Sequence, residues 1–412
     1  MTSRERILAA LNHRETDRVP IDFGGHRSSG ITGMAYARLR EYLGLEQRPI
    51  RIYDPIQQLA IIDEDVLDRF GADTIELGRG FSLTDDCWSE WTLPNGIVCR
   101  MPAWALPGRQ DDCWILRSNT SGRALAKMPT GVQYFEQCHW PYLDGADTFD
   151  NLSEALSESM WSGIASPPGP TEIGEPDGQD VLAAGARKLR ESTDRAILGL
   201  FGGNLFEMGQ FVFRMDNFLM LMAAEPKTVH AFLDKLIELH LHNVEQYLGA
   251  VGDCIDIICI GDDFGMQSGP LISTPMYREF FKPRQQMLID KIREMADVKV
   301  NLHSCGDISS FLPDIIDVGI DAVNPVQISC AGMDLTHLKR EYGKDLTFWG
   351  GGCDTHQVLP HGTTEEVAKH VNRQVAVGRQ GGGFIFQQVH NIQTGLPPEN
   401  VVAMFDAVNT VE

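Results

Sequence analysis

One short motif, His303-Ser-Cys305-Gly, brings together two residue types that bind metals and take part in proton transfer. It follows the run Val298-Lys-Val-Asn-Leu302 directly, and this run has the composition of a buried strand. A neutral imidazole and a thiolate form a ligand pair that suits zinc. A histidine packed beside a buried thiol is the more ordinary explanation of four residues alone, so the metal interpretation needs further ligands.

Two more nitrogen or sulfur donors stand where later apolar runs end. Cys353 follows the run FWGGG, and His390 follows the run FIFQQV. If these runs are strands of one parallel barrel, their carboxyl ends share a rim, where barrel enzymes place their active sites. The sequence therefore predicts a metal site of His303 and Cys305, with Cys353, His390 or both as the remaining ligands.

Three carboxylates are candidates for the proton chemistry. Asp262 and Asp263 follow the apolar run IICIG, and Glu207 follows FGGNLF. Neighbouring carboxylates raise each other's pKa, which suits a proton donor at neutral pH. Capping of the next turn explains the two aspartates equally well, and a favourable position at a helix start explains Glu207.

Five further polar residues are candidate substrate contacts. Asp22, His26 and Arg27 lie in the segment IDFGGHRSSG, where Arg27 is the best partner for an anionic group because its planar guanidinium matches a carboxylate. A surface loop is the alternative for these three. Asn204 and Gln327 complete the set, each after another apolar run.

The elements that must position these residues alternate along the chain. Helical patterns are predicted for residues 3–11, 33–43, 63–70, 180–192, 216–223, 227–250, 275–295, 308–317, 334–342 and 364–377. Short apolar runs ending in Gly, Asp, His, Asn or Cys separate the later helices, and two earlier runs follow Pro20 and Ala72. Strands buried on both faces and joined by helices indicate a parallel sheet, so we expect one α/β domain over residues 1–412, a (β/α)8 TIM barrel.

Residues of about 81–175 differ from this pattern. Six tryptophans lie there (88, 91, 104, 114, 140 and 161), and Pro94-Asn-Gly96 is typical of a hairpin turn. We expect an aromatic-rich β-hairpin inserted in the barrel, with its aromatic rings packing against the barrel mouth rather than stacking on a substrate.

Charge and composition exclude several classes of partner. The formal net charge is −22, which disfavours nucleic acid and anionic lipid surfaces. No apolar run approaches the roughly 20 residues that cross a bilayer, and the charged start has no secretory pattern, so we expect a cytoplasmic protein. Nine cysteines, an odd number, are consistent with a reducing compartment. The glycine-rich segments lack the spacing of nucleotide-binding loops.

Several segments together resemble the uroporphyrinogen decarboxylase-like superfamily. They are SRERILAALNHRETDRVP, GPLISTPMYREFFKPR, NLHSCGDISSFLPDIIDVGIDAVNPVQ, FWGGGCDT and HNIQTGLPPENVVAMFDAV, and they cover nearly the whole chain outside 81–175. The decarboxylases of that superfamily imply an arginine-rich substrate motif after the first strand, where this chain keeps only Arg27.

The zinc-dependent corrinoid methyltransferases of the superfamily are the closer resemblance. They imply zinc on the His-x-Cys motif, which His303 and Cys305 match, and on a later Cys, where this chain has His390. The expected function is transfer of a methyl group from a small methylated substrate, such as an aryl methyl ether, to a corrinoid on a partner protein. The alternatives are a cofactor-free decarboxylase and a non-catalytic barrel binding protein. For the oligomeric state, the hypothesis is a homodimer.

Overall fold

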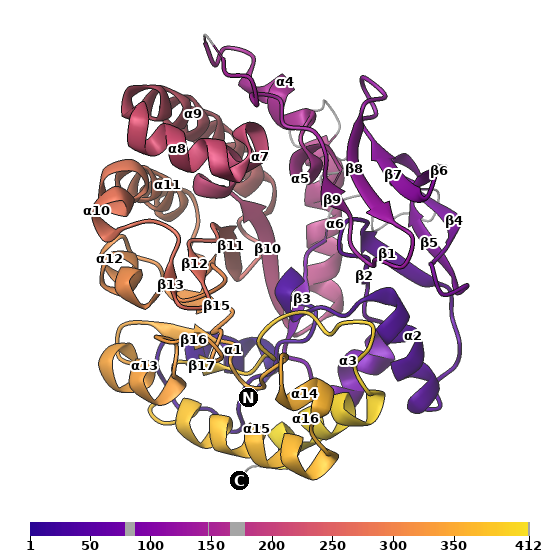
Figure 1. Cartoon of the computed structure of the whole chain (residues 1–412). Helices are drawn as coiled ribbons and strands as arrows, with labels where there is room; N and C mark the ends of the chain where they lie inside the picture. The colour runs from indigo at the N-terminus through magenta and orange to yellow at the C-terminus, as the bar shows by residue number, and fades with distance from the viewer. Residues whose placement is uncertain (79–86, 147, 165–177, 411–412) are drawn as a thin grey trace.

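The centre of the molecule is a curled, parallel β-sheet of seven strands, in the order β17-β16-β15-β14-β11-β10-β3 (Figure 1). The computed structural model describes residues 1–78, 87–146, 148–164 and 178–410. The strands are β3 (Thr74–Glu76), β10 (Ala196–Gly202), β11 (Ile257–Gly261), β14 (Lys299–His303), β15 (Ala322–Asn324), β16 (Thr347–Trp349) and β17 (Phe384–Ile385). The parallel direction and the connecting helices confirm an α/β fold of the barrel type.

The two edges of this sheet meet across the segment that follows Pro20. The amide of Asp22 donates to the carbonyl of Phe386 beside β17, and the carbonyl of Ile21 accepts from the amide of Asp73 beside β3. The sequence predicts eight strands, whereas the structure has seven and an isolated bridge at Ile21 in the eighth place. Pro20 lacks an amide hydrogen, and Gly24 has a φ of 78°, so a regular strand cannot continue there.

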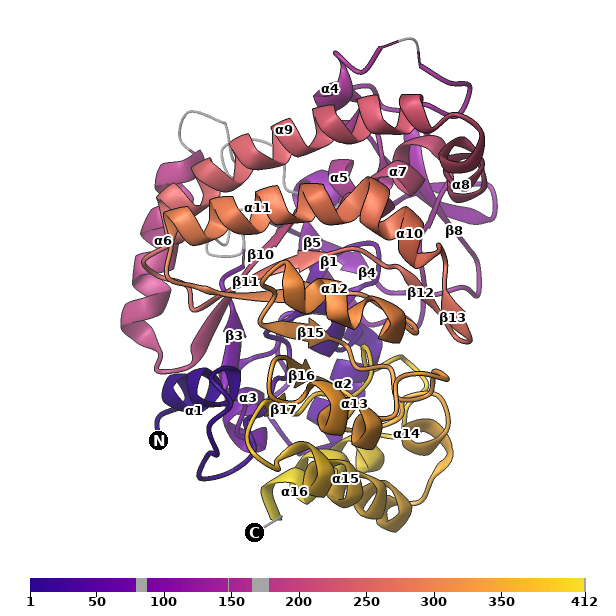
Figure 2. The same ribbon diagram turned by 90° about the vertical axis from the view of Figure 1, so that its left-hand side faces the viewer.

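Helices cover the outer face of the sheet (Figure 2). The helices described after α1, apart from α4 and α5, are α2 (Gly33–Tyr42), α3 (Glu64–Phe70), α6 (Gly178–Ser192), α7 (Phe206–Phe213), α8 (Met215–Ala224), α9 (Pro226–Val251), α10 (Thr274–Met276), α11 (Lys282–Met295), α12 (Leu312–Asp317), α13 (Leu335–Tyr342), α14 (Val358–His361), α15 (Thr364–Gly378) and α16 (Pro398–Thr410). The single helix predicted over 275–295 is divided, because a π-helical turn at Tyr277–Phe281 separates α10 from α11. None of the described helices is both long and apolar enough to cross a bilayer.

Helix α1 (Ser3–Leu11) packs against the amino-terminal end of the sheet. Thr2 and Glu5 form a capping box at its start, and Ile7 and Leu11 join a buried cluster with Leu198 and Trp349. This buried apolar cluster fills the interior of the barrel at the amino-terminal end of the strands. The carboxyl ends of the strands are therefore where polar side chains gather.

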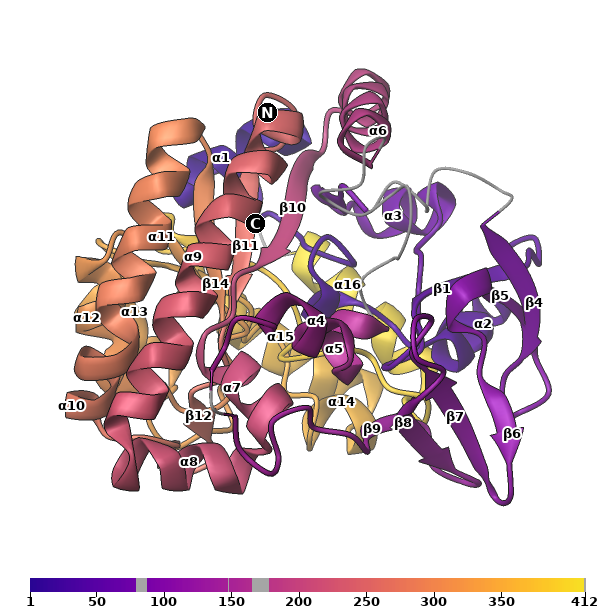
Figure 3. The same ribbon diagram turned by 90° about the horizontal axis from the view of Figure 1, so that it is seen from above.

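Residues 50–60 and 87–137 form two additional sheets beside the barrel (Figure 3). One has the order β2-β1-β5-β4 and the other the order β6-β7-β8-β9. Their strands are β1 (Ile50–Asp54), β2 (Leu59–Ala60), β4 (Trp88–Thr92), β5 (Val98–Pro102), β6 (Gly108–Gln110), β7 (Cys113–Arg117), β8 (Ala124–Pro129) and β9 (Glu136–Gln137). Two short helices follow, α4 (Leu152–Ser157) and α5 (Met160–Gly163).

The predicted hairpin turn lies between β4 and β5, which pair in antiparallel register. The rings of Trp91 and Trp114 meet edge to face at 5.5 Å, so aromatic packing joins the two sheets. The region is larger than the single hairpin that we expected. That it is an insertion in one barrel domain stays a prediction, and its residues 81–86, 147 and 165–175 lie outside the described residues.

Candidate active site

The parallel register gathers the predicted polar residues at one rim. Gly261 of β11 lies opposite His303 of β14, and His303 lies opposite Asn324 of β15. Asp262 and Asp263, which follow β11, are therefore brought beside the His303-Ser-Cys305 turn. In a barrel this is the face that carries chemistry.

Three nitrogen or sulfur donors converge at this rim. One ligand atom each from His303, Cys305 and His390 lies within 4.8 Å of the other two. The Cys305 Sγ atom is 3.5 Å from His303 Nε2. Two donors bound tetrahedrally to one zinc ion, with Zn–S of about 2.3 Å and Zn–N of about 2.0 Å, would be roughly 3.6 Å apart. The donor set and its spacing therefore fit zinc.

Cys353 does not belong to this group. The chain leaves β16 through Gly350 and Gly351, with φ of 117° and 73°, and passes close to the backbone of Val326. Cys353 then bridges to Gln388, where its side chain is fully buried and burial raises the pKa of its thiol. Of the two donors that the sequence left open, the geometry selects His390.

The orientation of His303 is fixed by a network that our reading of the sequence missed. His303 Nδ1 lies 2.8 Å from Asn324 Oδ1, which also accepts a hydrogen bond of 2.6 Å from Ser28 Oγ. Asn324 Nδ2 donates to Gln387 Oε1 at 2.6 Å, and Gln387 Nε2 donates to Ser28 Oγ at 3.1 Å. Because Asn324 Oδ1 can only accept, His303 carries its hydrogen on Nδ1 and turns the lone pair of Nε2 toward Cys305.

Charge and burial disfavour a free thiolate at Cys305. Burial raises its pKa well above the ordinary value, and the negative charge of Asp263 raises it further. Burial lowers the pKa of His390 to about 4, so its imidazole is neutral at pH 7. A neutral imidazole is the form that binds a metal, whereas the thiol needs a nearby cation to ionise.

Asp262 and Asp263 have different surroundings, although they are adjacent. Asp262 is buried and accepts hydrogen bonds from the amides of Leu205 and Glu207 at the start of α7. Burial raises its pKa to about 7. Asp263 Oδ1 accepts from the amide of Cys305 at 2.7 Å and lies 3.7 Å from His303 Nε2. Asp263 is therefore the carboxylate that contacts the donor cluster.

Glu207 stands at the start of α7 and accepts a hydrogen bond from Asn204 Nδ2 at 2.5 Å. Burial raises its pKa well above the ordinary value, and the charges of Asp263 and Asp262 add to this shift. Both effects favour the protonated form of Glu207. The predicted substrate contact Asn204 is positioned to hold this acid, and its own carbonyl contacts His240 Nε2 at 2.9 Å.

Gln327 supports the turn rather than facing an open space. Its Oε1 atom accepts from the amide of Gly306 at 2.8 Å, and the residue is buried. Gly306 has a φ of 82°, and a Cβ atom there would lie 2.3 Å from the backbone of Gly265. The close approach requires glycine, and the Gln327 hydrogen bond holds the loop after Cys305 in place.

The three candidate substrate contacts Asp22, His26 and Arg27 have different surroundings in the structure. Asp22 is fully buried and accepts from Thr74 Oγ1 and Trp349 Nε1, so its carboxylate is already satisfied. The ring of His26 stacks on His303 with 5.0 Å between centroids, and burial lowers its pKa well below the ordinary value. The uncharged His26 offers no positive charge to an anion. Arg27 alone supplies one.

The fold and this rim of donors and acids define an enzyme-like α/β barrel protein. The family model described as uroporphyrinogen decarboxylase (URO-D) matches residues 175–411. The chain belongs to the uroporphyrinogen decarboxylase family.

Relatives of two named activities share this family. The chain is 26% identical over 200 residues to a methylated-thiol–coenzyme M methyltransferase of Methanosarcina mazei, a match that covers 48% of this chain and 49% of that protein. It is 27% identical over 194 residues to a uroporphyrinogen decarboxylase of Shewanella frigidimarina, with 45% and 49% covered. The chain spans about half the length of the curated relatives it matches.

The fold is also similar to that of a solved methyltransferase from Methanosarcina mazei. The TM-score is 0.59 with 17% sequence identity, and the match covers 99% of this chain and 98% of the other. This likeness shows that the two chains share a fold over their whole length.

Proposed function

We propose that this protein is a zinc-dependent methyltransferase that moves a methyl group from a small methylated substrate, such as an aryl methyl ether, to a corrinoid carried by a partner protein. The observation that carries the proposal is the convergence of His303, Cys305 and His390 within 4.8 Å. The similarity to a methylated-thiol methyltransferase supports methyl transfer in general.

The residues that would hold zinc are His303, Cys305 and His390, which leaves a fourth position for substrate. Zinc bound there would act as a Lewis acid that polarises the oxygen or sulfur carrying the methyl group. Asn324 keeps the His303 ring in the orientation that the site requires, because it fixes the hydrogen on Nδ1. Asp263 holds the Cys305 backbone amide and so sets the position of the thiol.

Glu207 is the proton donor in this proposal. The carbon–oxygen bond of a methyl ether breaks with its electron pair left on oxygen, which then takes the proton of the Glu207 carboxyl group. A corrinoid bound by the partner protein would supply the electron pair for the new bond to the methyl carbon. Burial favours the protonated form of Glu207, and its hydrogen bond with Asn204 fixes its direction. Asp262 holds the start of α7, on which Glu207 stands.

Decarboxylation is the second candidate, because the family and several relatives carry that name. A porphyrinogen with four acetate groups requires several positive charges, whereas Arg27 is the one arginine in the segment after the first strand. Release of CO2 from a porphyrinogen by metal-free protein would replace methyl transfer with decarboxylation as the function.

Metal analysis of the purified protein tests the proposal. We expect about one zinc per chain in the native sequence, and loss of zinc in His303→Ala, Cys305→Ala and His390→Ala. Cys353→Ala is the matched control, since this buried thiol lies outside the donor group, and it should keep its zinc. A native protein without zinc, or a Cys305→Ala variant with full zinc content, would exclude the proposed mechanism.

A further inference from the structure

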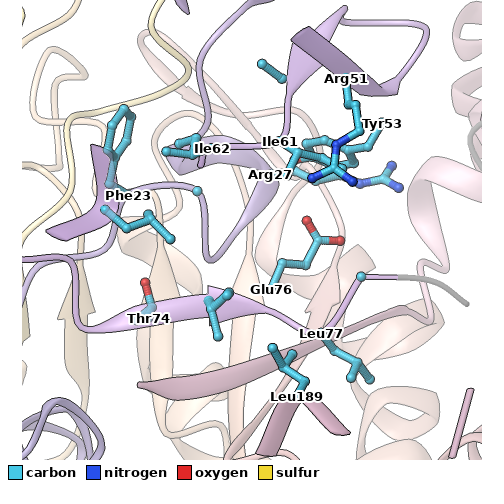
Figure 4. A pocket seen from close by; sticks show the side chains of 15 residues that line it. Phe23, Arg27, Arg51, Tyr53, Ile61, Ile62, Thr74, Glu76, Leu77 and Leu189 are labelled. Carbon is cyan, nitrogen blue, oxygen red and sulfur yellow. The ribbon is translucent and has the colours of Figure 1, made fainter. Parts of the chain in front are cut away.

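A cavity of about 180 Å³ opens at the carboxyl end of β3, and the three metal-ligand candidates are not among its lining residues (Figure 4). Its wall is mainly apolar, with a polar group at one end. The apolar residues include Phe23, Ile61, Ile62, Leu67, Ile75, Leu77 and Leu189, and the polar ones are Arg27, Arg51, Tyr53, Thr74 and Glu76.

The polar end is formed by two arginines from different elements. Arg27 comes from the segment after Ile21, and Arg51 and Tyr53 come from β1 of the first additional sheet. Figure 4 shows the Glu76 carboxylate directed toward the guanidinium groups of Arg27 and Arg51. The lining at one end of an otherwise apolar cavity thus has two positive charges and one negative charge, and the carboxylate of Asp54, which is not in the lining, lies 3.6 Å from Arg27 Nη1.

Arg27 has hydrogen-bonding capacity that the protein does not use. Its Nε atom is buried and has no hydrogen-bond partner among the described residues, although its Nη1 lies 3.6 Å from Asp54 Oδ2. Asp54 already accepts from the amides of Ile56 and Gln57 and from Gln57 Nε2. A buried N–H without a partner is costly, so a ligand that accepts from Arg27 would relieve that cost.

Arg51 supplies the second charge. Its guanidinium lies over the ring of Trp88 at 5.8 Å, and within the described part of the chain it forms no salt bridge. Stacking on an aromatic face holds the guanidinium plane and leaves its edge open to a carboxylate. Two such groups together are the usual way to bind one carboxylate in several hydrogen bonds.

The lining of the cavity is connected to the candidate metal site through the chain and through the sheet. Arg27 directly follows His26, whose ring stacks on His303 at 5.0 Å. Glu76 ends β3, which pairs with β10 in the sheet that carries His303.

We propose that this cavity binds a small aromatic monocarboxylate, with its carboxylate on Arg27 and Arg51 and its ring against Phe23, Ile62 and Leu189. A second acid group is repelled by Glu76, which selects monoacids, whereas a phenolic hydroxyl can donate to that carboxylate. The assignment rests on the proposed function in one respect: as a methyl donor, the bound acid carries its methyl group on a ring oxygen.

Calorimetric titration with benzoate tests the binding site without any turnover. We expect saturable binding to the native protein, and much weaker binding of methoxybenzene and of benzene-1,3-dicarboxylate. Arg51→Gln should weaken benzoate binding about tenfold or more, because a charged hydrogen bond is lost. Arg48→Gln, which removes an exposed arginine paired with Glu46 on the same segment, should leave it unchanged.

Two further variants separate this site from the metal site. Leu189→Trp should fill the cavity and abolish benzoate binding while zinc content stays normal. His303→Ala should lose zinc and keep benzoate binding, so a failure of methyl transfer does not remove the acid site. The proposal is overturned if benzoate does not saturate, if methoxybenzene binds equally well, or if Arg51→Gln binds benzoate as tightly as the native protein.

Discussion

His303 Nδ1 and Asn324 Oδ1 lie 2.8 Å apart, and this contact fixes which imidazole nitrogen faces Cys305. Asn324 is itself held by Ser28 and Gln387, so its amide cannot turn over without breaking two other hydrogen bonds. The polar network below the donor cluster therefore determines the chemical state of one of its members.

Replacing Asn324 should weaken metal binding although it touches no metal. We expect Asn324→Leu to lower zinc affinity by about 10- to 100-fold, the usual effect of removing a hydrogen-bond partner of a ligand histidine. Competition with a chelator measures the affinity, and ¹⁵N NMR of the metal-free protein reports the His303 tautomer. Gln388→Met is the control, because the side-chain amide of this buried residue has no hydrogen-bond partner in the part of the chain that the structure describes. Equal zinc affinity in Asn324→Leu and the native protein would contradict this role.

Glu207 should matter for turnover and little for substrate binding. A protonated acid that donates in the transition state contributes about 10²- to 10⁴-fold, so we expect Glu207→Gln to lower kcat by that factor with a nearly unchanged KM. The amide keeps the shape of the side chain and its contact with Asn204. Steady-state kinetics with a methylated substrate and a corrinoid acceptor measures both constants. A KM increase with normal kcat would instead assign Glu207 to substrate binding.

Asp262 should contribute to stability through the start of α7. Its carboxylate accepts from the amides of Leu205 and Glu207, and Asp262→Ala would leave both buried donors without a partner. We expect the free energy of unfolding to fall by about 1–3 kcal/mol, as measured by urea titration. Asp253→Ala, which removes an exposed carboxylate, should change it by less than about 0.5 kcal/mol. A stable Asp262→Ala protein with impaired turnover would favour a direct catalytic role.

His240 should make stability depend on pH. Burial lowers its pKa to about 4, so between that value and the ordinary 6.5 the unfolded chain binds a proton that the folded chain does not. The contribution of His240 to stability is then complete above pH 6.5 and is lost as the pH falls toward 4, by roughly 3 kcal/mol in total. Urea titration of the native protein and of His240→Gln at several pH values gives the free energy of unfolding of each. The difference between the two profiles isolates the contribution of His240. Parallel pH profiles of the two proteins would show that His240 does not titrate in this way.

The surroundings of each cysteine should determine how fast its thiol reacts with alkylating reagents. Burial and the charges near Cys305 raise its thiol pKa, and Cys353 is buried, so both should react slowly with thiol reagents at pH 7 in the folded protein. The half-exposed Cys87 and Cys113 should react first. Mass spectrometry after brief alkylation gives the order, and rapid labelling of Cys353 in folded protein would be inconsistent with its position.

The sequence alone determined the order of elements and the pair at the centre of the site. Alternating apolar runs and helical periods identified the barrel strands β10, β11, β14, β15, β16 and β17, and polar residues at their ends included His303, Cys305, Asp263 and Glu207. These features are local, because a short apolar run followed by polar residues marks a strand end wherever it occurs.

The tertiary structure decided which distant residues meet. Cys353 and His390 have the same signal in the sequence, and only the glycine-lined path after β16 buries Cys353 and leaves His390 beside Cys305. Asn324 and Arg51 gave no chemical signal of their own, since one acts through a hydrogen bond to His303 and the other comes from a sheet outside the barrel. Contacts of this kind depend on sheet register and packing between segments far apart in the chain, which local sequence patterns do not specify.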